Sequence, residues 1–196
     1  MVQIPPRLYT PEEYLQREAD ADYKSEYRNG EIVPMAGGTT NHNELALNLA
    51  AALKLGLRGQ CKVYMGDVRL WIPEYGQYTY PDVMTVRGLP AYAGASKTTV
   101  TNPTMIAEVL SKSTQNYDQG DKFMYYRSIA SMQEYVLIDQ GRCHVIQHSK
   151  TETGQWLLTE YWQEADVLRL QAIAFNIGLA DLYDGIDFGA SEGASG

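Results

Sequence analysis

Two acidic residues stand inside apolar runs of the kind that form buried strands. Asp82 interrupts "YPDVMTV" (80–86), and Glu108 interrupts "PTMIAEVLS" (103–111). Burying a carboxylate is costly unless the group is paired, hydrogen-bonded or bound to a cation. Each acid therefore implies a partner, and two such acids raise the question of a shared one.

The two acids converge if their runs are neighbours in one sheet, connected by a long loop at 87–102. Converging carboxylate oxygens suit Mg2+ or Mn2+, which take one or two carboxylates and leave positions open for water and phosphate oxygens. The pattern thus predicts a metal site. The alternative is a salt bridge from either acid to an arginine such as Arg69 or Arg87, the commoner situation for a single buried carboxylate.

A basic residue follows the second acid on a predicted helix. In "STQNYDQGDKFMYYRS" (113–128), Asp118, Lys122 and Tyr126 are spaced four apart and share one helical face. From such a helix the lysine can lean over the two carboxylates. The alternative is a solvated ion pair between Asp118 and Lys122, which is the usual meaning of this spacing.

The remaining pattern alternates short helices and strands and contains no internal repeat. Thr10 before Pro11 caps a helix running to about Arg17, and Asn29-Gly30 forms a two-residue hairpin turn. The apolar stripe in 41–57 predicts an amphipathic helix that ends near Gly56 or Gly59. Strands are expected at 61–65, 68–72, 80–86, 104–110, 134–139, 143–148, 156–162 and 167–171, and further helices at 117–129 and 177–186.

These elements predict an α/β or α+β fold with a mixed sheet flanked by helices. The length of 196 residues suits one domain, which we expect over residues 1–188. The closing "GASEGASG" (189–196) is small and polar, so a disordered tail is expected there.

Composition limits the classes of function. A hydrophobic content of 44% is typical of globular proteins, and a net charge of -8 argues against broad attraction to nucleic acid or anionic membranes. No apolar run approaches the ~18 residues of a membrane span, and "MVQIPPRLYTPEEY" lacks the features of a signal peptide. We therefore expect a cytoplasmic protein in which Cys61 and Cys143 are free thiols.

The runs "YPDVMTV", "PTMIAEVLSKST", "YDQGDKFMYY" and "EYVLID", in this order and spacing, resemble the Uma-two-type restriction endonucleases of the PD-(D/E)xK nuclease superfamily. The segments "SEYRNGEIVPMAGGTTNHN" and "GLADLY" extend the resemblance over nearly the whole chain. It implies a restriction-endonuclease-like core in which Asp82 and Glu108 are the acids of the motif. By the same match, Glu26 is an early acid that approaches the site, and His42 occupies a position that is often polar or histidine.

The sequence departs from the superfamily motif at the lysine. The motif places lysine two residues after the second acid, where this chain has Leu110. Lys112 keeps the same strand face but lies roughly 13 Å from Glu108, at about 3.3 Å per residue. Lys122, on the following helix, is the better candidate for the missing basic group.

The resemblance implies a metal-dependent endonuclease that hydrolyses DNA. Asp82, Glu108 and the carbonyl of Val109 would hold Mg2+ or Mn2+, and Lys122 would orient a water or stabilise the transition state. Glu26 would bind a second ion or hold Lys122, unless it is only a surface residue of the hairpin.

Other polar residues have weaker assignments. His42 and Lys112 are candidate phosphate contacts, although His42 at a helix start is more often just a polar residue. His144 and His148 are expected to pack or lie at the surface and not to form a metal pair.

A second class of function remains open, because the strand lysine is missing and the chain is acidic. It is a nuclease-fold protein that binds nucleic acid or a protein partner without cutting. Binding of DNA by an acidic chain requires a local basic surface, which a homodimer would help to assemble.

Overall fold

A six-stranded mixed sheet is the largest element of the computed structural model, which describes residues 7–111 and 114–189. The strand order is β11-β10-β9-β8-β6-β3, with β8 parallel to β9 and the other neighbours antiparallel. Its strands are β3 (Cys61–Met65), β6 (Val83–Arg87), β8 (Met105–Leu110), β9 (Glu134–Asp139), β10 (Val145–Lys150) and β11 (Trp156–Tyr161).

A second sheet of five strands has the order β2-β1-β5-β4-β7, in which only β4 and β7 are parallel. Its strands are β1 (Ser25–Arg28), β2 (Glu31–Pro34), β4 (Arg69–Ile72), β5 (Gln77–Thr79) and β7 (Thr99–Val100). A C-terminal hairpin adds β12 (Val167–Leu170) and β13 (Phe175–Gly178).

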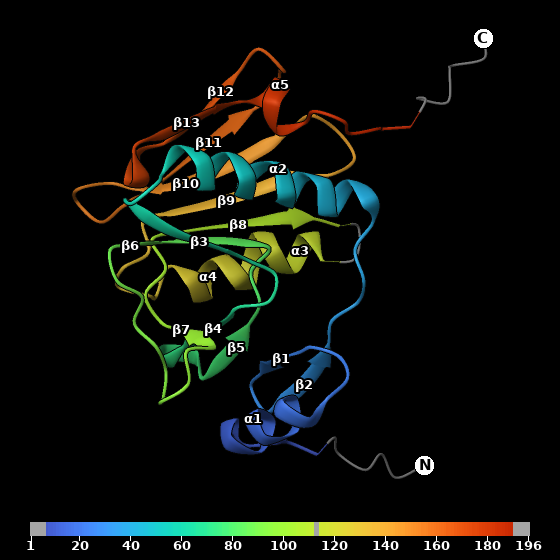
Figure 1. Cartoon of the computed structure of the whole chain (residues 1–196), viewed down its shortest axis with the longest axis vertical. Helices are drawn as coiled ribbons and strands as arrows, with labels where there is room; N and C mark the ends of the chain where they lie inside the picture. Colours follow the sequence, from blue (N-terminus) through green and yellow to red (C-terminus); the bar gives the residue numbers. More distant parts are fainter. Residues whose placement is uncertain (1–6, 112–113, 190–196) are drawn as a thin grey trace.

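Helices lie on both faces of the six-stranded sheet (Figure 1), with α2 on one face and α3 and α4 on the other. A π-helical segment, η2, joins α3 directly to α4. The helices are α1 (Pro11–Asp20), α2 (Thr40–Gly56), α3 (Gln115–Tyr117), η2 (Asp118–Lys122), α4 (Phe123–Tyr126) and α5 (Leu179–Leu182), with 3-10 turns η1 (Pro73–Tyr75) and η3 (Gln171–Ile173).

Strand β8 is buried on both faces, which explains its nearly continuous apolar sequence. Ala107 and Val109 pack in the cluster under α2, whereas Ile106 and Leu110 pack in the cluster that contains the α4 tyrosines. Since side chains alternate along a strand, Glu108 points to the same face as Ile106 and Leu110. The carboxylate therefore faces the helical segment that carries the lysine.

The structure confirms the predicted helix cap at Thr10, the hairpin turn at Asn29-Gly30 and the helix in 41–57. Thr10 and Glu13 make a reciprocal capping box at the start of α1. Asn29 (φ 50°) and Gly30 (φ 93°) occupy the left-handed region in the turn between β1 and β2, as a type I′ hairpin turn requires. The predicted helix in 41–57 is α2, with Thr39 as its cap.

The strand predicted at 80–86 is shorter, since β5 ends at Thr79 and β6 begins at Val83. The residues between them carry the chain from the five-stranded sheet into the six-stranded sheet. Pro81 has no N–H to donate and breaks the ladder at this crossing. The predicted strands are thus divided between two sheets and the C-terminal hairpin, and Asp82 stands where the chain enters the six-stranded sheet.

Three other expectations are corrected. The segment 87–102, expected as a loop, contains β7. The helix expected at 117–129 ends at Tyr126 and has a π-helical centre. The helix expected at 177–186 is reduced to the four residues of α5, because its first residues complete β13.

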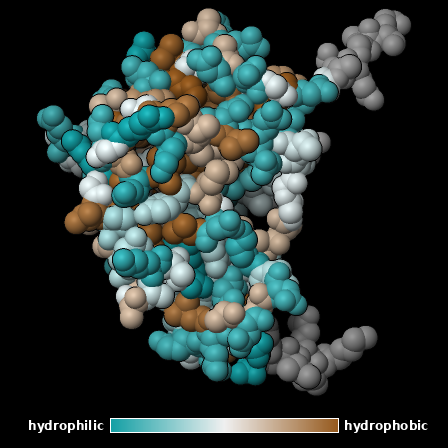
Figure 2. All heavy atoms as spheres, viewed as in Figure 1, coloured by the Kyte–Doolittle hydropathy of each residue, from teal (hydrophilic) through white to brown (hydrophobic). Residues whose placement is uncertain are grey.

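The expectations drawn from composition concern membrane helices, the surface, the cysteines and the C-terminal tail. No helix within 7–111 and 114–189 is long and apolar enough to cross a membrane. On the face shown in Figure 2, hydrophilic residues predominate and hydrophobic ones form small separate patches. Cys61 and Cys143 are free thiols, and residues 190–196 of the predicted tail lie outside the described part of the chain.

Gly56 tests how α2 is joined to the C-terminal hairpin. A Cβ at Gly56 would lie 2.4 Å from Cε2 of Phe175 in β13, so we expect Gly56→Ala to lower the free energy of unfolding by about 1–3 kcal/mol. Gly120→Ala is the control, because no described atom outside its own helical segment lies within 4 Å of its Cβ. Urea unfolding of both variants measures the difference, and equal stabilities would show that Phe175 moves aside without cost.

Candidate active site

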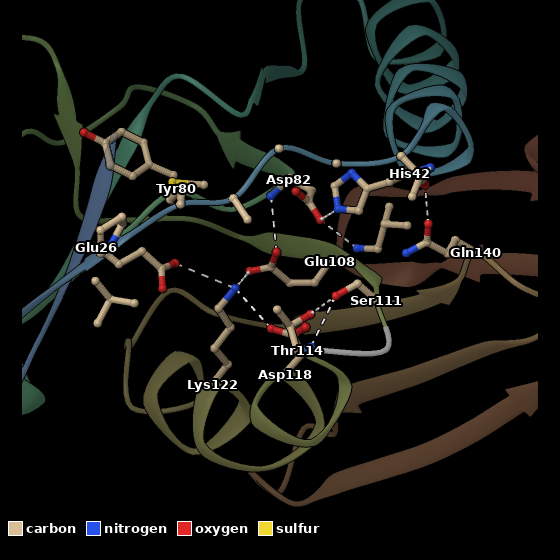
Figure 3. Close-up of a pocket in the computed structure, with 18 of the residues that line it drawn as sticks. Glu26, His42, Tyr80, Asp82, Glu108, Ser111, Thr114, Asp118, Lys122 and Gln140 are labelled. Carbon is tan, nitrogen blue, oxygen red and sulfur yellow. Dashed lines mark hydrogen bonds and ion pairs between the residues drawn. The ribbon is translucent and has the colours of Figure 1, made fainter. Parts of the chain in front are cut away.

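A pocket of about 470 Å3 lies where the two sheets, the start of α2 and the η2 segment meet. Figure 3 shows its side chains pointing toward one another from these four parts of the fold. The charged and histidine side chains that line it are Glu26, Arg28, His42, Asp82, Glu108, Asp118 and Lys122.

Lys122 is the centre of the charge network. Its Nζ lies 2.9 Å from Oε1 of Glu108, 3.2 Å from Oδ1 of Asp118 and 3.8 Å from Oε1 of Glu26. The residue is only 8% exposed and Asp118 only 3%. The solvated ion pair considered from the spacing is therefore wrong, because both groups are buried and share two further carboxylates.

The two carboxyl oxygens of Glu108 differ in their contacts, because one has two short hydrogen bonds and the other has a long one. Its Oε1 accepts from Lys122 and from the hydroxyl of Tyr126 at 2.6 Å. Among the residues that the structure describes, its Oε2 has one long contact, 3.4 Å from the backbone nitrogen of Asp82. The charged partner of Glu108 is thus a lysine, not Arg69 or Arg87 as the salt-bridge alternative had it.

The Asp82 side chain accepts a backbone hydrogen bond from β8, on the side of β8 that faces β6. The pairing of β6 with β8 ends at Val83 and Ala107. Two residues further along β8, the N–H of Val109 faces the same side but has no partner in β6. It donates instead to Oδ2 of Asp82 at 2.8 Å. Because a strand residue directs its N–H and C=O to the same side, the Val109 carbonyl also lies on the Asp82 edge.

His42 lies in the first turn of α2 and reaches the same carboxylate. Its Nε2 is 3.1 Å from Oδ2 of Asp82, and the backbone of Gly38 lies against the ring, where a Cβ would be 3.0 Å from Nδ1. Thr39 fixes the turn by accepting from the His42 N–H. The ring is thereby bonded to an acid of the site, which a merely polar helix-start residue would not be.

Glu26 is connected to Glu108 by two routes, one through Thr79 and Tyr126 and one through Lys122. Its Oε1 accepts from the Thr79 hydroxyl, which lies 3.4 Å from the Tyr126 hydroxyl. Tyr126 in turn donates to Glu108, and Lys122 lies between the two glutamates. Glu26 is 4% exposed, so its interpretation as a surface residue of the hairpin is wrong.

The surroundings raise the pKa of Glu108 and lower the pKa of Asp82. Burial raises the pKa of Glu108 to about 8, against the opposing effect of Lys122. Burial also acts to raise the pKa of Asp82, but the bonds from His42 and Val109 outweigh it and leave that pKa below its ordinary value. The bond to Asp82 raises the pKa of His42.

Lys122 remains charged. Burial acts to lower its pKa, but Glu108, Glu26 and Asp118 outweigh burial and hold it well above the ordinary value. The same lysine, with Arg28, keeps the pKa of Glu26 below its ordinary value against the effect of burial. The pocket thus combines one proton-holding carboxyl, Glu108, with a permanent ammonium.

Sequence reasoning missed several residues of this site. Arg28 and Thr79 both contact Glu26, and only the two-residue spacing of Glu26 and Arg28 on β1 signalled a shared face. Tyr126 was placed on the correct helical face but had no assigned role. Lys112, the candidate phosphate contact, lies outside the described residues.

The two other histidines pack against aromatic rings. The His144 ring stacks on Trp162 with centroids 3.6 Å apart, and the His148 ring stacks on Phe123 at 4.1 Å. Within the described chain, no group of three or more His, Cys, Asp or Glu side chains is arranged to hold a metal ion.

The raised pKa of Glu108 has a measurable consequence. A carboxyl whose pKa is about 8 in the folded protein, against an ordinary value of 4.5, keeps a proton that the unfolded chain has lost. Its stabilising contribution is complete below about pH 4.5 and is lost as the pH rises toward 8. We expect Glu108→Gln to flatten the fall of unfolding free energy between these values, measured by urea unfolding from about pH 5 to 8.

Some slope will remain in that variant, because burial also raises the pKa of Glu134, to about 7. Glu152→Gln, in an exposed turn, is the matched control and should follow the unsubstituted protein. Parallel curves for Glu108→Gln and Glu152→Gln would contradict the assignment of the proton to Glu108.

Comparison with known proteins places the chain in a family. The model of the family Uma2, described as "Putative restriction endonuclease", matches residues 11–180. The chain is 46% identical over 165 residues to the uncharacterized protein sll1609 of Synechocystis sp., covering 84% of this chain and 93% of that protein. It is 33% identical over 184 residues to the uncharacterized protein slr1290 of the same organism, covering 93% and 95%.

The fold also has a counterpart among crystal structures. A protein from Anabaena variabilis, titled a putative nuclease belonging to DUF820, superposes with a TM-score of 0.71. The match is 15% identical and covers 89% of this chain and 97% of that one, so it concerns the fold alone. The predicted restriction-endonuclease-like core is confirmed. The chain belongs to the Uma2 family of restriction-endonuclease-like proteins.

Proposed function

We propose that the protein is a Mg2+- or Mn2+-dependent endonuclease that hydrolyses phosphodiester bonds in DNA. The observation that carries the proposal is the convergence of Asp82, Glu108 and Lys122 in one pocket. The lysine comes from the helical segment after β8 and reaches Glu108 from there, so its ammonium stands beside the second acid although the motif position holds Leu110. The family description supports the same class of activity.

The open oxygens of the pocket fit a hard divalent cation. Asp82 has one oxygen engaged and Oδ1 without a hydrogen bond within the described part of the chain, and Glu108 has only a long contact at Oε2. With the Val109 carbonyl they make three oxygen donors, which suits an ion that completes its shell with water and phosphate oxygens. When bound, such an ion acidifies a water and neutralises charge on a phosphate oxygen.

The protein's own groups hold protons and charge around the reacting phosphate. Lys122 remains protonated, so it donates hydrogen bonds and stabilises negative charge instead of accepting a proton. Tyr126 and Lys122 together fix Oε1 of Glu108, which leaves Oε2 directed to the pocket. His42, bonded to Asp82, holds that carboxylate in place and presents a cationic ring when protonated.

We also propose that the protein acts as a cytoplasmic homodimer. The net charge of -8 disfavours binding of DNA by the chain as a whole, so the contact must come from a local concentration of basic groups. Two copies in symmetric association would double such a surface.

Metal binding is tested by thermal stability. Because a ligand that binds only the folded state stabilises it by about 2.7 kcal/mol at a hundred times its Kd, Mg2+ or Mn2+ should raise the Tm of the unsubstituted protein. The Asp82→Asn/Glu108→Gln double variant replaces both acids by uncharged amides of nearly the same shape, which cannot become anionic ligands, and should lose the shift. The same shift in both proteins would place the ion elsewhere.

Cleavage is tested on supercoiled plasmid, incubated with Mg2+, with Mn2+ and with a chelator. We expect nicked or linear product with the ions and none with the chelator. Binding of the plasmid without product under any of these conditions would favour the alternative, a nuclease-fold protein that binds without cutting.

Lys122 is tested by single-turnover cleavage at saturating enzyme, which isolates the chemical step. Lys122→Met keeps the apolar stem but removes the charge that compensates the transition state, so we expect a rate loss of about 100- to 1,000-fold. Since this lysine has three buried carboxylate partners, the variant will also be less stable, and the assay must be run well below its Tm.

Lys112→Ala is the comparison variant for this test. As a candidate phosphate contact it should weaken DNA binding and change the single-turnover rate little. A larger rate loss for Lys112→Ala than for Lys122→Met would move the catalytic lysine to position 112.

A further inference from the structure

The geometry points to Arg28 as the residue that binds a phosphate of the substrate in this pocket. The inference rests on the proposed function, because it names the group that the site would use to hold nucleic acid. It is carried by the contacts of the guanidinium and by its place among the basic groups of the pocket.

Among residues 7–111 and 114–189, three basic side chains line the pocket, and Arg28 keeps the most donors without a protein partner. Lys122 is surrounded by three carboxylates and its side chain is 10% exposed. His42 directs Nε2 to Asp82. The Arg28 side chain is 30% exposed and is the most accessible of the three.

The guanidinium of Arg28 uses one edge and leaves the other open. Its Nε donates to Oε2 of Glu26 at 2.9 Å, and Nη2 donates to the same oxygen. These two bonds use two of the five N–H donors of an arginine, so three remain. Within residues 7–111 and 114–189, Nη1 has no hydrogen-bond partner.

The Tyr117 ring fixes the plane of the Arg28 guanidinium, and Glu26 fixes one of its edges. The Arg28 Cζ lies 3.8 Å from the centroid of the Tyr117 ring, in the α3 turn just before η2. A guanidinium held by a ring on its face and a carboxylate on one edge presents its remaining donors in one direction. Such pre-organisation suits two parallel hydrogen bonds to phosphate oxygens, which a lysine cannot make.

Neighbouring carboxylates do not cancel this cation. Glu26 is bonded to Thr79 and faces Lys122, and Asp118, which also lies near Arg28, is paired with Lys122. Each of these charges is thus shared with a second partner. Arg28 lines the same pocket as Asp82 and Glu108, so a phosphate bound there by its open donors would share that pocket with the acids.

The test measures binding without cleavage. A fluorescein-labelled double-stranded DNA oligonucleotide is titrated in Ca2+ at several salt concentrations, and the Kd is followed by fluorescence anisotropy. Loss of one phosphate contact makes the slope of log K against log salt shallower by about 0.9. We expect this change for Arg28→Gln, with affinity about tenfold weaker at low salt.

Arg28→Lys separates the contact from the charge. It keeps the positive charge and the pairing with Glu26 but loses the planar fork, so its affinity should fall between those of the unsubstituted protein and Arg28→Gln. Arg7→Gln is the matched control. Arg7 also pairs with a glutamate, Glu13, and lies over a tyrosine ring, Tyr9, but it does not line the pocket.

The outcomes separate this inference from the proposed function. Binding by Arg28→Gln with the affinity and salt slope of Arg7→Gln would overturn the phosphate assignment, even if the unsubstituted protein cleaves DNA. Absence of DNA binding by the unsubstituted protein would overturn it too. Binding that depends on Arg28 in a protein that never cleaves would leave the phosphate site in place and reject the nuclease.

A structural role is excluded by a parallel measurement. If Arg28 served only to neutralise Glu26, its replacement would change the Tm and the metal-induced Tm shift but leave the salt slope unchanged. A changed Tm with an unchanged slope would therefore also overturn the assignment.

Discussion

A buried ammonium group surrounded by three carboxylates is the constraint on which this structure depends. Removing the charge of Lys122 from water is costly, and that cost is offset only if its partners arrive in good geometry. Those partners come from β1 of the five-stranded sheet, β8 of the six-stranded sheet and the η2 segment itself. The packing of the two sheets and the helix against one another is therefore tied to the same atoms that form the pocket.

The segment between β5 and β6 carries the chain from one sheet to the other and supplies residues to both sides of this network. Thr79, the last residue of β5, bonds Glu26, whereas Asp82, three residues later, bonds the edge of β8. The proline between them prevents one continuous ladder. A short segment thus sets the distance between the two halves of the site, and a change of its length would alter both halves together.

Much of the site was predictable because it depends on periodicity within single elements. Alternation along β8 and the spacing of four on the following helix were enough to bring Glu108, Lys122 and Tyr126 to one place. The contacts of Arg28 and Thr79 were not predictable in this way, because they depend on how β1 and β5 pair and how their sheet packs on η2. The shortened strand before Val83 has a similar cause, since a pattern of residues does not show when a strand changes sheets.

The π-helical form of η2 has a consequence for how the family can vary. A π-turn bonds residue i to i+5, so it accommodates one residue more than an α-turn of the same length. Losing one residue between Asp118 and Lys122 would restore an ordinary α-helix and leave the turns on either side close to their present orientation. Tyr117 and Tyr126 would keep their places, whereas Asp118 and Lys122 would stand three residues apart instead of four. Relatives whose segment is one residue shorter would thus retain the ring that supports the arginine and keep the acid and the lysine on one helical face.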